Sequence, residues 1–193
     1  MKIKIFLVAV GVLFFFEGAG QSLPRVKMET SLGNIVVEID TLKAPVTGKN
    51  FLDHVHVNTF KNAVFYRVVR MDNQPNNEIK IEVIQGGIYT EPRFGDIKPI
   101  EHETTDQTEI KHKDGTISMA RMEPGTASTE FFICVGDQPE LDFGGNRNSD
   151  GQGFAAFGQV VEGMDVVRAI QNLKDKNQTL LDKVAIQKMA IVK

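Results

Sequence analysis

The stretch VKMETSLGNIVVEID, residues 26 to 40, decides the class of fold. It holds two short runs, Val26 to Glu29 and Asn34 to Asp40, on either side of Ser31-Leu32-Gly33. Alternation of side chains with a period of two and β-branched residues is typical of strands, and a Gly between two such runs is typical of a tight turn. The stretch therefore predicts a β-hairpin.

The hydrophobic period changes directly after this hairpin. From Pro45 the apolar side chains fall on one face at helical spacing, and a proline in the first turn costs nothing because its missing N–H would have no partner there. This pattern predicts a helix over residues 45 to 57. Apolar residues at steps of three predict a second helix over residues 163 to 173.

The rest of the chain reads as short strands rich in β-branched and aromatic residues. They are expected at residues 64–69, 81–85, 116–120, 130–135, 155–161 and 184–192. Two isolated helices cannot supply the strand–helix alternation of a parallel sheet. The sequence therefore predicts a mainly β fold, a closed antiparallel eight-stranded β-barrel capped by two α-helices.

Composition narrows the class of protein further. The chain has 193 residues, 41% of them hydrophobic and 24% charged, with a net charge of −3 and no low-complexity segment, which favours one globular domain. It lacks the basic stripe of a nucleic-acid binder, so no nucleic-acid partner is expected. Its single cysteine, Cys134, cannot form an internal disulfide, and the apolar residues around it predict a buried, inert thiol.

The first 20 residues differ from the rest. Lys2 and Lys4 precede an apolar run over residues 5–16, and Gly18-Ala19-Gly20 follows, which is the pattern of a secretory signal peptide. The run is also shorter than the roughly 20 residues of a membrane-spanning helix. We expect cleavage that leaves a domain of residues 21–193, exported to the periplasm or secreted, with no stable membrane insertion. The alternative is an uncleaved N-terminal anchor.

Six motifs along this domain resemble, in order, the landmarks of one family. They are FYRVV at residues 65–69, VIQGG at 83–87, GTISMA at 115–120, EFFI at 130–133, LD at 141–142 and FGQVVEGM at 157–164. Each motif is weak alone, but the ordered set is similar to that of the cyclophilin-type peptidyl-prolyl cis-trans isomerases. The resemblance runs from about Val26 to Lys193, and GFAAFG at residues 153–158 looks most like exported bacterial members.

The resemblance implies an enzyme that accelerates rotation about X–Pro bonds in unfolded or exported proteins. It implies no cofactor and no metal, and we expect a monomer. Arg67 matches the family's catalytic arginine, and Gln85 matches the residue that supports it and binds the substrate backbone. From the residues alone, the favoured interpretation of Arg67 is a surface ion pair, which is what most strand arginines form. The positions that match the family's substrate-binding residues are Val83, Ala120, Arg121, Phe132, Leu141 and Phe154.

Several positions depart from the family's commonest pattern. Glu82 stands where an aromatic wall of the proline slot is expected, so either a carboxylate replaces that wall or the loop of residues 71–80 shifts the register. Arg121 replaces Asn, Glu130 replaces Gln, Glu140 replaces Trp, and Phe154 lacks a polar group. The added carboxylates favour basic peptides, or they are solvated side chains or partners of Arg121. The alternative function is a Pro-peptide-binding chaperone module with weak turnover.

Two metal-site patterns fail on spacing. Residues 146–151 resemble the start of a calcium loop, but the twelfth position is Phe157, where a bidentate Glu is needed. His54 and His56 are two residues apart on the predicted helix and point to different faces. No metal site is predicted.

Overall fold

A computed structural model describes residues 22–192, and the predicted signal peptide lies outside the described residues. Within these residues, nine strands and three α-helices follow one another, with two short 3-10 helices at Pro92–Asp96 and Pro139–Leu141. The strands are β1 (Arg25–Thr30), β2 (Gly33–Ile39), β3 (Val64–Val69), β4 (Val83–Gly87), β5 (Thr116–Met119), β6 (Phe131–Cys134), β7 (Ala155–Glu162), β8 (Asp175–Lys176) and β9 (Thr179–Val192). The helices are α1 (Pro45–His56), α2 (Thr105–Thr108) and α3 (Met164–Gln171).

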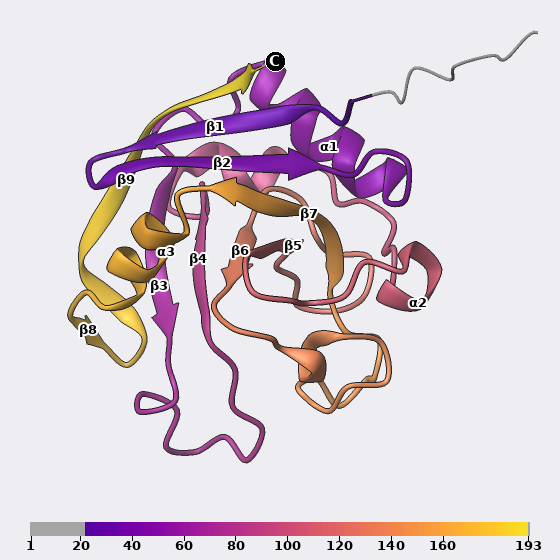
Figure 1. Ribbon diagram of the computed structural model, residues 1–193, viewed down its shortest axis with the longest axis vertical. Coiled ribbons are helices and arrows are strands. Elements are labelled where there is room, and N and C mark those ends of the chain that lie inside the picture. Colours follow the sequence, from indigo (N-terminus) through magenta and orange to yellow (C-terminus); the bar gives the residue numbers. More distant parts are fainter. Residues whose placement is uncertain (1–21, 193) are drawn as a thin grey trace, which may run out of the picture.

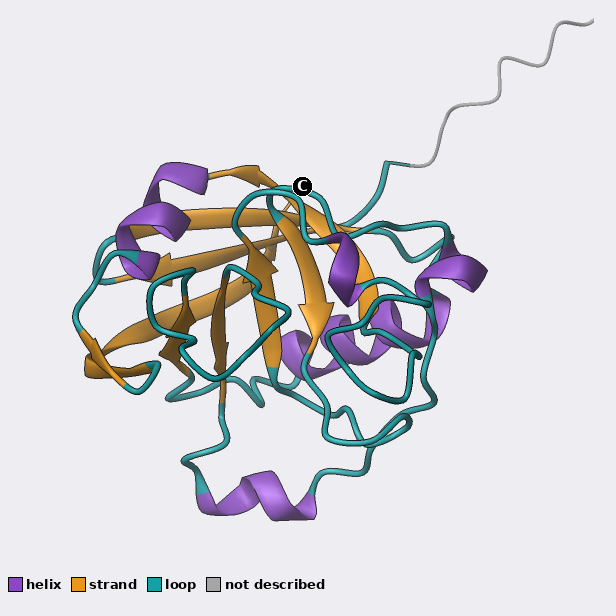
Figure 2. Ribbon diagram, turned by 90° about the horizontal axis from the view of Figure 1, so that it is seen from below, coloured by secondary structure: helices purple, strands orange, loops and turns teal. Residues whose placement is uncertain are grey.

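The strands close into a barrel. Their order is β1-β2-β7-β5-β6-β4-β3-β9, every pairing is antiparallel, and β9 pairs back onto β1 to complete the ring. The two-residue strand β8 pairs with β9 beside this ring. Figure 2 shows the strands around the centre of the molecule with the helices outside them. The predicted eight-stranded antiparallel barrel is confirmed.

The two predicted helices are present and cover separate parts of the barrel (Figure 1). Helix α1 inserts Phe51 among the rings of Phe131 and Phe157, with centroid distances of 5.7 and 5.1 Å. Helix α3 packs Val167 and Ile170 against the same core from the side of β2, β3 and β4. No described helix has the length and apolarity to cross a membrane.

Two strands start more than one residue away from the predicted position. Strand β4 starts at Val83 rather than at residue 81, and β9 starts at Thr179 rather than at residue 184. Polar residues dominate the start of β9, so its hydrophobic pattern is weak there. Pairing with β8 and with β3 extends it nevertheless. Tertiary pairing thus overrides the local pattern.

Strands β4 and β6 are buried on both faces. One face of each strand packs in the barrel core, and the other packs in an apolar cluster outside the barrel, where the candidate site lies. Ile84 and Ile133 point into the barrel core. Their neighbours point outward into a second, smaller apolar cluster made of Val69, Ile81, Val83, Phe132, Cys134 and Leu141. The thiol of Cys134 is free and fully buried, as predicted, and burial raises its pKa.

Candidate active site

One pocket on the outer face of the barrel brings together all eight predicted site residues. Its volume is about 270 Å³. The predicted residues that line it are Arg67, Val83, Gln85, Ala120, Arg121, Phe132, Leu141 and Phe154. Ile81, Met122, Arg147 and Asn148, which the sequence did not single out, complete the lining.

The deep part of this pocket is an apolar slot. Phe132 from β6 is 4% exposed and Leu141 is fully buried. The ring of Phe154 meets that of Phe132 edge to face, at 5.3 Å and 89°. Beneath it, the His112 ring stacks on Phe132 at 5.9 Å. A slot walled by packed aromatic and aliphatic side chains suits a ring of the size of proline.

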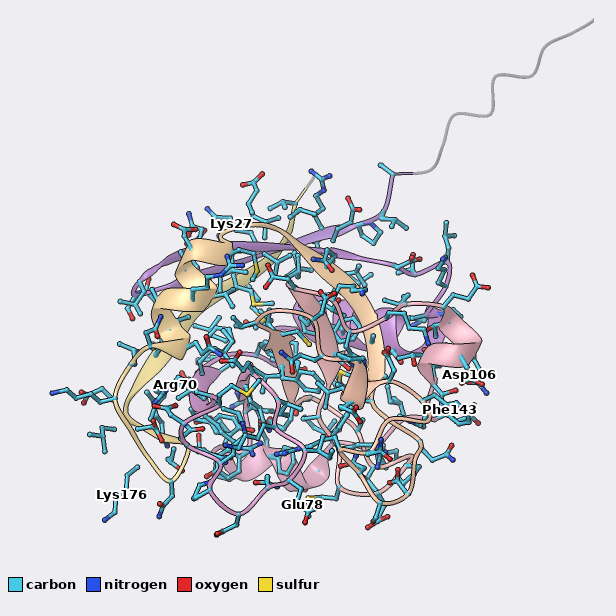
Figure 3. The ribbon with its side chains drawn as sticks, turned by 60° about the horizontal axis from the view of Figure 1, so that its bottom comes forward. Lys27, Arg70, Glu78, Asp106, Phe143 and Lys176 are labelled. Carbon is cyan, nitrogen blue, oxygen red and sulfur yellow. The ribbon has the colours of Figure 1, made fainter. Side chains whose placement is uncertain are left out.

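Contacts around His112 hold this slot in place. Its two ring nitrogens lie 2.8 Å from Asp142 Oδ1 and 3.0 Å from Ser118 Oγ. Asp142 directly follows Leu141, in the segment that covers the outer cluster. That segment is also tied to α2, since the Phe143 N–H donates to Thr105 Oγ1 at 2.9 Å, and Figure 3 shows Phe143 near Asp106 of this helix.

The guanidinium of Arg67 is held from two sides. Its Nη1 donates to Gln85 Oε1 at 2.8 Å, and its Nε and Nη2 donate to Gln178 Oε1 at 3.1 and 2.6 Å. Burial lowers the pKa of Arg67, but an arginine stays protonated in proteins. Within residues 22–192 it belongs to no ion pair, so it is not the surface salt bridge that a strand arginine usually forms.

Gln178 is a site residue that sequence reasoning missed. It lies in the turn between β8 and β9 at φ 69°, and its N–H donates to Asp175 Oδ2 at 2.8 Å. Arg70 binds the other oxygen of Asp175 and the carbonyl of Gln171, which ties this turn to β3 and α3. Figure 3 shows Arg70 and Lys176 on this side of the molecule. No local motif marks such a turn.

Arg121 lies over the face of Phe154, with its guanidinium carbon 5.2 Å from the ring centroid. It donates to both oxygens of Asp150, at 2.8 and 2.9 Å, and to the carbonyl of Gly153. Hydrogen bonding by Arg121 lowers the pKa of Asp150 to about 2. The partner of Arg121 is thus Asp150, within the loop that resembles a calcium site, and none of the three added glutamates.

The added glutamates lie outside this pocket. Glu82 follows Ile81, which is 6% exposed and lines the apolar wall together with Val83. Glu140 accepts hydrogen bonds from the backbone and side chain of Asn146. Glu130 is 8% exposed and accepts from Tyr66 at 2.6 Å. The pocket itself carries arginines, so its lining gives no support to a preference for basic peptides.

A second pocket of about 300 Å³ adjoins the first. The two share Gln85, Ala120, Arg121 and Met122, and the second is further lined by Tyr66, Tyr89, Phe94, Thr126, Ser128 and Glu130. Together they form one extended groove on the barrel surface. A groove with an apolar slot beside a rigid cation has room for residues on both sides of a bound ring.

Comparison with known proteins agrees with this geometry. The family of cyclophilin-type peptidyl-prolyl cis-trans isomerases matches residues 25–191. A peptidyl-prolyl cis-trans isomerase of Acinetobacter baylyi is 31% identical over 191 residues, covering 98% of this chain and 93% of that protein. Peptidyl-prolyl cis-trans isomerase B of Escherichia coli is 36% identical over 152 residues, covering 77% and 84%.

A solved structure shares the fold. It is a cyclophilin-type isomerase of Cryptosporidium parvum, crystallised in the presence of the dipeptide Ala-Pro, and it superposes with a TM-score of 0.70. The two sequences are 23% identical, and the match covers 88% of this chain and 99% of that one.

Proposed function

Because the chain belongs to the cyclophilin-type peptidyl-prolyl cis-trans isomerases, and so catalyses rotation about X–Pro bonds, we propose that Arg67 is its electrostatic centre. Gln85 supports Arg67, while Val83, Phe132, Leu141 and Phe154 hold the proline ring. Ala120 and Arg121 bind the extended backbone of the substrate. The observation that carries this proposal is that the guanidinium of Arg67 lines the same pocket as the apolar slot.

Rotation about an X–Pro bond breaks no covalent bond, so catalysis requires only that the enzyme binds the twisted amide more tightly than the planar one. Amide resonance sets a barrier of about 18–20 kcal/mol to rotation, and a twisted amide localises a lone pair on the prolyl nitrogen. Of the five N–H donors of a guanidinium, three on Arg67 are engaged by Gln85 and Gln178. The remaining N–H groups can donate to the twisted amide. Because the donors are already oriented, they stabilise the transition state more than either ground state.

The substrates we propose are Pro-containing segments of unfolded or exported proteins, bound by a monomer without cofactor or metal. The apolar slot and the extended groove support a peptide ligand, and the Ala-Pro dipeptide with which a structural relative was crystallised is of the same kind. We also propose that residues 1–20 direct the chain out of the cytoplasm, on the strength of their charged, apolar and small-residue pattern.

The test compares residues 21–193 with the Arg67→Ala variant. Cis–trans exchange of a blocked Ala-Pro peptide is followed by NMR, with peptide affinity measured on both proteins. Loss of one preorganised donor typically costs 10²–10³ in rate, so we expect kcat/KM to fall by about 100-fold. Peptide affinity should change by less than about threefold, because the slot that grips the ring stays intact.

Arg168→Ala is the matched control, since Arg168 forms an exposed ion pair with Asp114 away from the pocket. Its rate should equal that of the wild type. A folded Arg67→Ala variant with undiminished rate would remove Arg67 from the mechanism. A wild type that binds the peptide without accelerating exchange would instead be the weakly active binding module.

A further inference from the structure

The hydrogen bonds behind Arg67 continue into a relay of side chains. Gln85 accepts from Arg67 through Oε1 and donates through Nε2 to the Tyr66 hydroxyl at 2.8 Å. That hydroxyl donates to Glu130 Oε2 at 2.6 Å. The order Arg67, Gln85, Tyr66, Glu130 is therefore a single donor-to-acceptor chain that ends on a carboxylate.

The carboxylate of Glu130 fixes the direction of this chain. An ionised carboxylate accepts only, so the Tyr66 proton is committed to it, and the Tyr66 oxygen is left to accept from Gln85. The amide of Gln85 must then turn its oxygen toward Arg67. Without the carboxylate, the Tyr66 hydroxyl could donate to Gln85 Oε1 instead, and the flipped amide would present N–H groups to the N–H groups of Arg67.

The backbone around Glu130 binds its carboxylate and leaves space for it. Its Oε1 accepts from the Ile88 N–H at 2.7 Å. A Cβ at Gly87, whose φ is +149°, would lie 2.2 Å from the same oxygen, so only glycine leaves room there. Glu130 and Tyr66 are each 8% exposed, which shields the relay from competing water.

We propose that Glu130 and Tyr66 are positioning residues that hold the amide of Gln85, and through it the guanidinium of Arg67, in the orientation that catalysis needs. This inference rests on the role of Arg67 proposed above. Under this proposal Glu130, which stands where the family commonly has Gln, orients Gln85 and does not serve to bind basic peptides. Neither side chain has to touch the prolyl bond.

The relay depends on pH. Burial raises the pKa of Glu130, against the hydrogen bonds that it accepts from Tyr66 and from the backbone N–H of Ile88. The other ionisable groups on this side are the phenols of Tyr66 and Tyr89 and the guanidinium of Arg121, which line the same pocket, with Arg67 behind Gln85. Burial and the neighbouring Glu130 raise the pKa of Tyr66, so its phenol keeps the proton that it donates to Glu130.

Protonation of Glu130 adds a donor where the relay needs an acceptor. The rate of the wild type should therefore fall as the pH drops, with a midpoint above the ordinary pKa of glutamate, about 4.3. The substrate for this measurement is a blocked Ala-Pro peptide without ionisable groups. NMR exchange is the readout because it needs no coupled protease with a pH dependence of its own.

In Glu130→Gln and Tyr66→Phe we expect kcat/KM at pH 7.5 to fall by about tenfold, which corresponds to about 1.4 kcal/mol, with peptide affinity unchanged. Both variants should also lose the acidic limb of the pH profile, since no titrating group then connects to Gln85. A merely structural role would lower the melting temperature without removing this limb. Melting temperatures and circular dichroism are recorded for every variant.

Glu103→Gln is the matched control. The Glu103 carboxylate also accepts backbone hydrogen bonds, from Val46 and Thr47 at the start of α1, but it lies outside both pockets. It should keep the wild-type rate and acidic limb. If Arg67→Ala loses the rate while Glu130→Gln keeps both rate and limb, the relay is wrong and the role of Arg67 stands. If Arg67→Ala also keeps its rate, the proposed function fails first.

Discussion

The orientations of Ile81 and Glu82 decide between the active isomerase and the weakly active binding module. The question is which of the two side chains forms the wall of the proline slot. Ile81 is 6% exposed and lines the pocket beside Val83, because residues at i and i+2 of an extended segment share a face. Glu82 has the opposite orientation, and its N–H donates to Gln138 Oε1 at 3.1 Å. The wall of the slot is thus apolar in spite of the glutamate in the sequence.

We therefore expect opposite results from the two alanine variants. Ile81→Ala removes apolar surface from the slot and should raise KM by about fivefold, which matches the loss of roughly 1 kcal/mol of burial. Glu82→Ala should leave both kcat and KM within about twofold of the wild type. Steady-state NMR exchange at several peptide concentrations measures both. A large rate increase in Glu82→Ala would show that the glutamate does impair the slot.

At this scale the residues that the family resemblance singled out lie together in the folded chain, and their roles stay a prediction. All eight residues predicted from the family resemblance line one pocket. Gln178 was missed because it acts from a turn whose position depends on Arg70 and Asp175, and no local pattern encodes that. The Tyr66–Glu130 contact joins β3 to the residue before β6 across 64 positions of sequence, which only the folded chain reveals.

Among the elements, strand β9 has two different pairing partners along its length. One part closes the barrel, and the other lies beside the proposed site. Its second half pairs with β1 from Thr30↔Ile186 to Arg25↔Val192, while its start, at Thr179, pairs with Arg67 of β3. Ile186 is 3% exposed in the main core, and Leu181 on the same strand is 61% exposed. The strand thus offers a buried and an exposed aliphatic position for comparison.

Ile186→Ala should lower the free energy of unfolding by about 2–4 kcal/mol, the usual cost of such a cavity. Leu181→Ala should change it by less than about 0.5 kcal/mol, since its side chain is already in water. Urea unfolding followed by circular dichroism measures both. Below its melting temperature, Ile186→Ala should keep the wild-type kcat/KM, because the pocket lies on the outer face and does not include this residue. A loss of rate in the folded variant would couple the core to the site.

The element pattern was predictable where hydrophobic periods are strong. The boundaries of β3 match the prediction, and both predicted helices agree to within two residues at each end. The four-residue α2 and the two-residue β8 were missed, since neither contains enough apolar residues to show a period. They depend on tertiary contacts, such as the bond from Phe143 to Thr105 and the hairpin with β9.

For the whole molecule, the described residues 22–192 hold the barrel and the two adjoining pockets of the groove. Strand β1 starts at Arg25, so a cut after residue 20 leaves every described strand and both pockets of the groove in place. Export with cleavage is therefore compatible with full activity. An uncleaved chain would keep Lys2, Lys4 and the apolar run as an anchor ahead of an intact barrel.

Expression of the complete chain in a Gram-negative host distinguishes these two forms. We expect the periplasmic fraction to contain a protein whose intact mass and N-terminal sequence start near Gln21, because a signal peptidase cuts after small residues such as those at 18–20. Replacing Ala19 by Lys should block this cut and leave the precursor in the membrane fraction. A wild-type product that starts at Met1 and sediments with membranes would make the protein an anchored isomerase, with the groove displayed at the membrane surface.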